Sequence, residues 1–169
     1  DKRFREYMAC AVTVTEFLMM LVVLITMKDQ TAGVEISGIC QMGLKFETDG
    51  FRAVYGIVAA FMWMMTTLFS TEYFRYYRNR NRYYLFMILT LGATEGILFS
   101  ADLYTTFIFF EMMSFTSYVW VAQDERKESL RAAETYLAIA VIGGLAILMG
   151  LFLLYHQAGT LMIDDLYQA

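Results

Sequence analysis

The sequence of 169 residues has no proline, two cysteines and one histidine, and these scarcities exclude several kinds of site. Without proline, nothing predicts the Gly/Pro-interrupted helices that secondary transporters often use at their binding sites. The weak point in the last apolar segment is the pair Gly143 and Gly144, and we interpret it as small-residue packing between helices. Cys10, Cys40 and His156 form no spacing typical of a metal or iron–sulfur centre. Neither GxGxxG nor GxxxxGKS/T occurs, so no nucleotide-binding loop is predicted.

Charged residues are also few, at 18% of the chain, and the net charge is −4. Lysine and arginine occur in short clusters beside apolar segments, which is the pattern of membrane-flanking loops. Such clusters suit contact with anionic lipid headgroups. They give no reason to expect a nucleic acid as a partner.

Apolar residues dominate what is left. They make up 59% of the chain, against roughly 45–50% in soluble domains. They gather in about five blocks, each near the 20 residues that a spanning helix needs, and most blocks lack a continuous polar face. The sequence therefore predicts an all-α, polytopic membrane helix bundle that forms a single membrane domain over residues 1–169. The predicted helices cover residues 7–27, 51–74, 83–101, 103–122 and 132–155.

Basic residues alternate with mixed or acidic loops along the chain. The basic segments are Lys2, Arg3 and Arg5; Arg75, Arg78, Arg80 and Arg82; and Arg126, Lys127 and Arg131. Because lysine and arginine near membrane ends mark the cytoplasmic side, this alternation predicts a cytoplasmic N-terminus, five crossings and a C-terminus outside.

A carboxylate stands in the middle of one apolar segment. An ionised Glu111, within 103–122, costs about 3 kcal/mol on insertion scales and is therefore a functional-site hypothesis by default. At helical spacing it shares a polar stripe with Tyr104, Ser114 and Tyr118. Burial disfavours the charged carboxylate and a nearby cation favours it, so a balanced carboxyl can exchange a proton. The alternative is a permanently protonated Glu111 that bonds a neighbouring helix in a structural scaffold subunit.

Other acidic residues also fall within predicted helices. Glu95, near the outside end of the third, and Glu134, near the cytoplasmic end of the last, are further candidate proton-relay groups. For Glu95 and for Glu16, in the first helix, we favour a packing role. For Glu134 an interfacial ion pair with Arg131, three residues before it, is an equally open interpretation.

Several ordered strings resemble a known family. DLYTTFIFFEMMSFTSY, residues 102–118, resembles the segment that marks the antiporter-like, proton-translocating membrane subunits of complex I, of multisubunit cation/proton antiporters and of membrane-bound hydrogenases. Phe110-Glu111 stands where the family usually has Trp-Glu. Upstream, TDGF resembles the start of a family helix and FSTEYFRYY the end of one. Downstream, RAAETY resembles the start of the helix after the glutamate helix. The resemblance covers about residues 44–155.

The resemblance implies a role for Glu111 as the intramembrane carboxylate that pairs with a lysine on a later, broken helix. This sequence would then hold helices two to six of a longer subunit built from two inverted repeats. It contains no such lysine, because its last lysine, Lys127, lies in a predicted loop. We therefore expect a fragment of a longer chain, with a naturally short subunit as the alternative.

The function that the resemblance implies is translocation of H⁺ or Na⁺ in a multisubunit membrane complex. The complex would couple it to NADH–quinone oxidoreduction, hydrogenase activity or cation/proton antiport. The chain itself would be a non-catalytic subunit without a cofactor, and partner membrane subunits would carry any flavin, iron–sulfur clusters or nickel–iron. The expected location is a bacterial or archaeal plasma membrane or an organellar inner membrane. A small receptor or lipid enzyme is disfavoured because no catalytic constellation is evident.

Overall fold

Five long helices and a small sheet make up the computed structural model, which describes residues 2–28, 30–38, 43–74 and 80–168. Cys40, Arg75 and Arg78 lie outside these ranges. In chain order the elements are α1 (Lys2–Thr26), β1 (Ala32–Ile36), β2 (Leu44–Thr48), α2 (Gly50–Tyr73), α3 (Arg80–Leu98), α4 (Leu103–Val121), α5 (Lys127–Ala158) and α6 (Ile163–Gln168).

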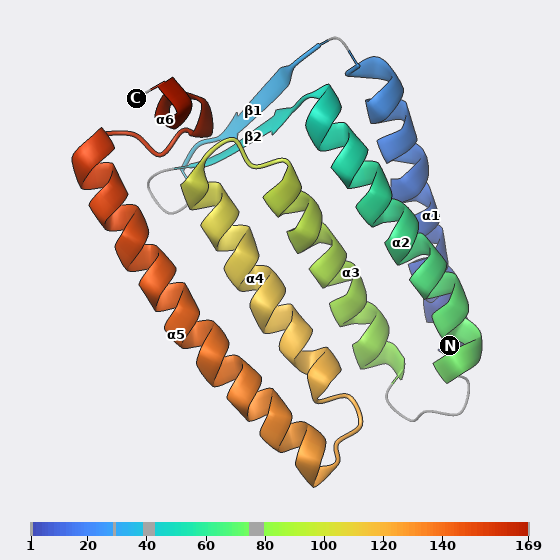
Figure 1. Ribbon diagram of the computed structural model, residues 1–169. Coiled ribbons are helices and arrows are strands. Elements are labelled where there is room, and N and C mark those ends of the chain that lie inside the picture. Colours follow the sequence, from blue (N-terminus) through green and yellow to red (C-terminus); the bar gives the residue numbers. More distant parts are fainter. Residues whose placement is uncertain (1, 29, 39–42, 75–79, 169) are drawn as a thin grey trace.

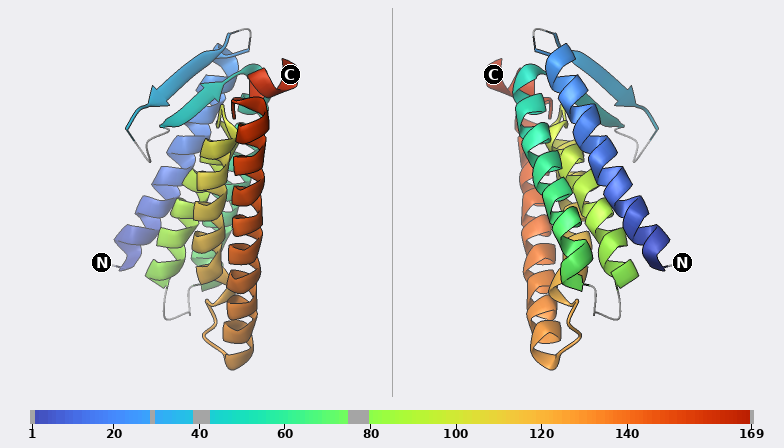
Figure 2. Two further views of the ribbon diagram at one scale, coloured as in Figure 1. Left: turned by 90° about the vertical axis from the view of Figure 1, so that its left-hand side faces the viewer. Right: turned by 90° about the vertical axis from the view of Figure 1, so that its right-hand side faces the viewer.

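The long helices run up and down beside one another. Helices α2, α3, α4 and α5 form a row in which each contacts the next, and α1 packs on α2 and α3 (Figures 1 and 2). The start of α1 and the α4–α5 loop lie at one end of the bundle, while the sheet and α6 lie at the other. Arg82, Arg126 and Arg131 therefore share the end that holds the N-terminus. That this end faces the cytoplasm stays a prediction.

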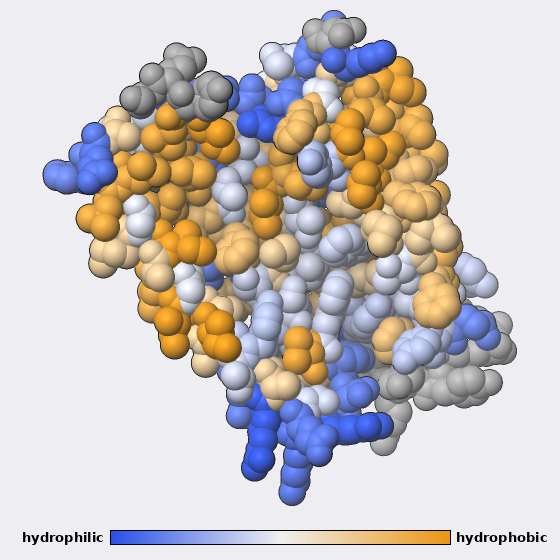
Figure 3. All heavy atoms as spheres, in the orientation of Figure 1, coloured by the Kyte–Doolittle hydropathy of each residue, from blue (hydrophilic) through white to orange (hydrophobic). Residues whose placement is uncertain are grey.

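On α2, small side chains fill the helix contacts and several large ones point outward. The buried residues of α2 are Ala53, Gly56, Ala60, Thr67 and Ser70. By contrast, Phe51 and Phe69 on the same helix are both 71% exposed. Apolar atoms cover both sides of the face drawn in Figure 3. Small interface residues with large apolar residues outside are typical of helices packed within lipid, and the predicted all-α membrane helix bundle is confirmed.

Not every predicted span is equally apolar. Among the described residues, Phe4–Thr26, Gly50–Tyr73 and Lys127–Ala158 are long and apolar enough to cross a membrane by length and composition. Helices α3 and α4, each 19 residues long, do not reach that standard. Both carry threonine and tyrosine residues and one glutamate each, which lower their hydropathy. Those polar residues lie in the two inner helices of the row, between α2 and α5.

A β-hairpin covers one end of the bundle, in a loop whose periodicity predicts no definite structure. Strands β1 and β2 pair antiparallel, with Val34 opposite Phe46. The α3–α4 loop bonds to the hairpin, because the Glu47 backbone N–H donates to Phe99 O at 2.8 Å and the Ala101 N–H donates to Lys45 O at 2.9 Å. The sheet, the loop and α6 together form a cap over α3 and α4.

Local signals in the sequence set where helices begin and end. The Asp49 and Asp102 side chains each accept a hydrogen bond, 2.7 Å long, from the backbone N–H three residues later. An aspartate in this position satisfies one of the free donors at a helix start. Gly159, with φ of 72°, ends α5 in the left-handed conformation that glycine adopts without strain.

Candidate functional site

The central candidate, Glu111, lies in α4 on the side that faces α5. It is eight residues beyond the start of α4 at Leu103, about 12 Å along the helix axis. The residue is half-buried, and its Oε1 is buried with no hydrogen-bond partner among the described residues. A buried polar atom without a partner costs roughly 1–3 kcal/mol, and more if it is charged. The carboxyl group is therefore an unsatisfied acceptor when ionised.

A glycine on the neighbouring helix makes room for this carboxyl group. A Cβ added at Gly144 of α5 would lie 2.7 Å from Cδ and 2.9 Å from Oε2 of Glu111. Real Cβ atoms essentially never come that close to another heavy atom. At Gly143, by contrast, an added Cβ would have no atom within 4 Å. The carboxyl of Glu111 thus rests against the bare backbone of α5 at Gly144.

The residues of the predicted polar stripe lie on the same helix as Glu111. Ser114 is buried, and its hydroxyl donates to Phe110 O at 3.0 Å. Tyr104 and Tyr118 are half-buried. The serine of the stripe is therefore bonded to the backbone of its own helix.

A second carboxyl group is buried where three helices meet. Glu95 of α3 is only 7% exposed, and neither Oε1 nor Oε2 has a hydrogen-bond partner among the described residues. A Cβ added at Gly56 of α2 would lie 3.1 Å from Glu95 Oε2 and 2.9 Å from Cζ of Phe99. Glu16 of α1 is half-buried. The carboxyl of Glu95 thus packs against Gly56 of α2.

Glu134 takes no part in either buried site. It is exposed on α5, ten residues before Gly144 and about 15 Å away along the axis. Arg131 is also exposed, and within the described ranges no ion pair joins it to Glu134. The three predicted relay glutamates therefore lie in three separate places. Sequence reasoning missed Gly56 and Gly144 as the contacts of the two buried carboxyls; a glycine inside an apolar helix was the available signal.

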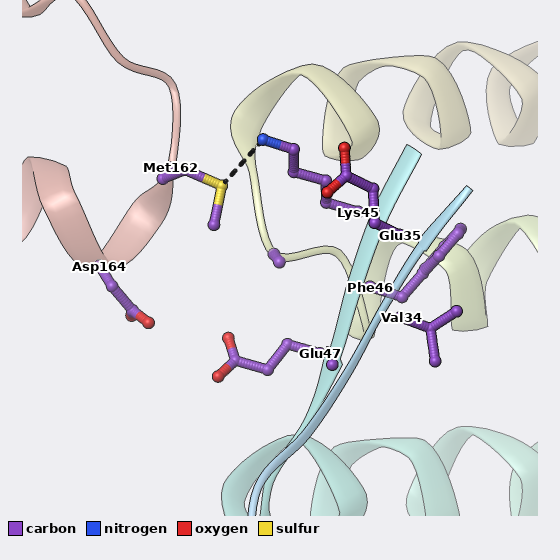
Figure 4. A pocket seen from close by; sticks show the side chains of 9 residues that line it. Val34, Glu35, Lys45, Phe46, Glu47, Met162 and Asp164 are labelled. Atoms are coloured by element: carbon purple, nitrogen blue, oxygen red, sulfur yellow. Dashed lines mark hydrogen bonds between the residues drawn. The ribbon is translucent and has the colours of Figure 1, made fainter. Parts of the chain in front are cut away.

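An open pocket lies within the cap, between the hairpin and α6 (Figure 4). Three carboxylates line it, from Glu35, Glu47 and Asp164. Lys45 also lines the pocket, with its Nζ 3.7 Å from Sδ of Met162. Glu47 is already paired, at 2.6 Å, with the Arg52 guanidinium. The pocket gives the capped end an acidic surface.

Sequence comparisons find antiporter subunits. The profile of a family described as "NADH:quinone oxidoreductase/Mrp antiporter, TM" matches residues 100–169. A Staphylococcus haemolyticus protein named as antiporter subunit mnhD2 is 33% identical over 121 residues, which is 70% of this chain and 24% of that protein. The Na⁺/H⁺ antiporter subunit A1 of Staphylococcus aureus strain Newman is 26% identical over 161 residues, 93% of this chain and 20% of its own length.

Solved structures share the fold. One is a chain in the membrane-bound sulfane sulfur reductase, an archaeal respiratory membrane complex, with a TM-score of 0.83 at 20% identity over 93% of this chain. Another is a chain of the Mrp complex from Dietzia sp. DQ12-45-1b, with a TM-score of 0.81 at 19% identity over 97% of this chain. This chain spans 33% and 32% of the lengths of those two chains.

Proposed function

Because the chain belongs to the family of antiporter-like membrane subunits, we propose that it takes part in translocating protons or cations across a membrane, with Glu111 as the relay. One observation carries the proposal: the Glu111 carboxyl lies well inside the bundle, with a buried, unpartnered oxygen against Gly144. Relatives named as Na⁺/H⁺ antiporter subunits support exchange of Na⁺ for H⁺. Coupling to NADH–quinone oxidoreduction or to a hydrogenase is the less supported alternative.

The physical basis is a carboxyl group with two stable states. In an apolar environment without a cation, the neutral acid is favoured because burial penalises the charged form. A lysine or metal cation brought close would favour the carboxylate and release the proton. Gly144 leaves the space in which the carboxyl can change its position or its partner. The cation would come from another part of the subunit or from a neighbouring subunit.

The proposal also assigns the remaining roles. Exposed apolar faces of α1, α2 and α5 would contact lipid and other membrane subunits. Any flavin, iron–sulfur or nickel–iron chemistry would belong to those partners, and this chain would supply the ion-translocating part. A relay role for Glu95 and for Glu134 stays a prediction. Glu95 packs against Gly56 and Glu134 is exposed, so neither contacts Glu111.

The test is Glu111→Gln in the full-length subunit, expressed with the other subunits of its complex. Glutamine keeps the shape of the side chain and cannot ionise. We expect normal assembly on native gels and loss of Na⁺-driven proton movement in everted membrane vesicles. The matched control is Glu128→Gln, an exposed position in the first turn of α5, which leaves transport unchanged. Unchanged transport in Glu111→Gln would instead support the scaffold role, with Glu111 permanently protonated.

A further inference from the structure

The contact between Glu111 and Gly144 depends on the height at which α4 stands beside α5. An α-helix rises about 1.5 Å per residue, so a small shift along the axis changes which residue of α5 the carboxyl meets. Gly144 is a position at which the carboxyl fits, because a Cβ added there would lie 2.7 Å from Cδ of Glu111. The bonds that hold α4 at its height beside α5 therefore also hold this contact.

Backbone hydrogen bonds join the start of α4 to the segment that follows α5, at the capped end of the bundle (Figure 1). The Leu103 N–H donates to Leu161 O at 3.0 Å, and the Ile163 N–H donates to Ala101 O at 3.2 Å. Helix α5 ends at Ala158, only three residues before Leu161. These bonds tie the start of α4 to the end of α5.

At the opposite end of α4, the backbone bonds close turns of the chain. The Gln123 N–H donates to Trp120 O at 3.2 Å, and the Glu125 N–H donates to Ala122 O at 3.1 Å. Both bonds span only three residues and shape the loop that leads into α5. Within the described ranges, the backbone bonds that join the two helix ends across a longer stretch of chain are thus those of the cap.

One side chain of α4 joins this arrangement to the hairpin. Thr105, in the first turn of α4, is 0% exposed, and its Oγ1 accepts a hydrogen bond from the Lys45 backbone N–H at 3.0 Å. Lys45 O accepts a second bond, from the Ala101 N–H at 2.9 Å. A single residue of β2 therefore holds the start of α4 through both of its backbone groups. Removing the threonine hydroxyl would leave the Lys45 N–H without its partner, which is unfavourable where water cannot replace it.

We propose that Thr105 is a positioning residue for Glu111. Its hydroxyl holds the first turn of α4 to the hairpin at the height where the Glu111 carboxyl meets Gly144. The two residues are six positions apart, about 9 Å along one continuous helix, so a displacement of the first turn is carried to the carboxyl. This inference rests on the proposed role of Glu111 in transport.

A double-mutant cycle in the full-length subunit, expressed with the rest of its complex, tests the proposal. Thr105→Val keeps the shape of the side chain and removes the acceptor, so transport per assembled complex should fall about threefold or more. In a complex that already carries Gly144→Ala, the same substitution should cause little further loss. Two changes that act through one contact are not additive, whereas independent changes multiply their effects on transport.

Two further variants control for a general loss of structure. Thr105→Ser keeps the hydroxyl and should transport like the wild type. Thr135→Val removes an exposed hydroxyl on α5 that donates to Arg131 O of the same helix at 3.0 Å, and it should leave transport unchanged. If Thr105→Val does not assemble, Thr105→Ala removes the acceptor with a smaller side chain and takes its place in the cycle.

Two results would overturn the proposal. Normal transport in Thr105→Val would mean that the hydroxyl does not position Glu111. An equal loss with and without Gly144→Ala would mean that Thr105 acts on another part of the subunit. The proposed function is judged separately, by Glu111→Gln. An inactive Glu111→Gln complex beside a fully active Thr105→Val complex contradicts this inference alone, whereas an active Glu111→Gln complex contradicts the proposed function itself.

Discussion

Two glutamates, Glu111 and Glu95, enter helix interfaces in the same way and have different surroundings. Each carboxyl faces a glycine of the adjacent helix, Gly144 for one and Gly56 for the other. Glu111 is half-buried, whereas Glu95 is buried, and neither Glu95 oxygen has a hydrogen-bond partner among the described residues. The first arrangement leaves a carboxyl ready for a cation from elsewhere. The second holds its carboxyl away from water.

In both places a glycine on the adjacent helix makes room for a carboxyl group, but the surroundings of the two carboxyls differ. A glycine removes the side chain that would exclude a carboxyl from a tight helix contact, and the neighbouring charges then decide which state is stable. The family profile matches residues 100–169, which include Glu111 and Gly144 but not Glu95 or Gly56. The family match therefore includes the contact between α4 and α5 at Glu111 and does not include the contact between α2 and α3 at Glu95.

The largest loss of stability should come from a substitution at the contact between α3 and α4, which lies between the two sites. A Cβ added at Gly96 would lie 2.5 Å from Cγ of Phe109, close to the point where that ring joins α4. The ring cannot move aside without shifting α4, so Gly96→Ala should destabilise the subunit by about 1–3 kcal/mol or more and disturb both sites. The thermal midpoint of the solubilised complex measures this. Gly92→Ala, where an added Cβ has no atom within 4 Å, is the control.

Gly144→Ala should separate transport from assembly. The added methyl group meets the far end of the flexible Glu111 side chain, which can move away. We therefore expect a complex that assembles normally. Ion transport should fall at least about tenfold, since a reacting group that is displaced by even a short distance loses much of its effect. Gly143→Ala should transport normally because its Cβ points into open space. Equal transport in both variants would contradict a role for the Glu111–Gly144 contact.

Gly56→Ala should lower stability more than it lowers transport, the reverse of Gly144→Ala. Its methyl group would meet Cζ of Phe99 at 2.9 Å and Glu95 Oε2 at 3.1 Å, so a ring as well as a carboxyl must move. The expected result is a loss of about 1–3 kcal/mol in stability, with less effect on transport than Gly144→Ala. Thermal unfolding and vesicle transport, measured on the same preparation, check both parts. A transport loss as deep as that of Gly144→Ala would mean that the two sites work as one.

The smallest effect concerns a contact far from both sites. Arg82 Nη2 lies 3.0 Å from Glu125 Oε1 at the end that holds the N-terminus, and both side chains are partly exposed. Exposed ion pairs contribute about 0.2–1 kcal/mol and weaken as salt rises. Arg82→Gln should therefore lower stability only slightly, by an amount that disappears at high salt. A large, salt-independent loss would show that this end of the bundle depends on Arg82 in another way.

The sequence predicted the all-α membrane bundle because long apolar runs admit few structures in a membrane. The short Ile163–Gln168 helix and the hairpin were not predicted, since strands such as Ala32–Ile36 have only weak alternation of apolar and polar residues. Glu111 could be identified because a carboxylate in an apolar run stands out on one helix. Its contact with Gly144, 33 residues later, depends on how two helices cross, and no local pattern records that.

Other contacts between helices were not predicted for the same reason, because they depend on how the helices cross. Gly56 and Glu95 are 39 residues apart, and only the packing of α2 on α3 brings them together. Conversely, Glu134 and Arg131 have suitable helical spacing for an ion pair, yet both side chains are exposed and unpaired with each other within the described residues. Spacing on one helix predicts which side chains share a face, while contacts between helices need the fold.

The central claim is that Glu111 changes its protonation during transport, and infrared difference spectroscopy on membranes holding the full complex tests it most directly. A Na⁺ gradient is imposed and removed by perfusion, and the spectra of the two states are subtracted. The account predicts a carboxylic-acid band that changes with the gradient in wild type and is missing in Glu111→Gln. A wild-type complex that transports ions while showing the same difference bands as an active Glu111→Gln complex would contradict it.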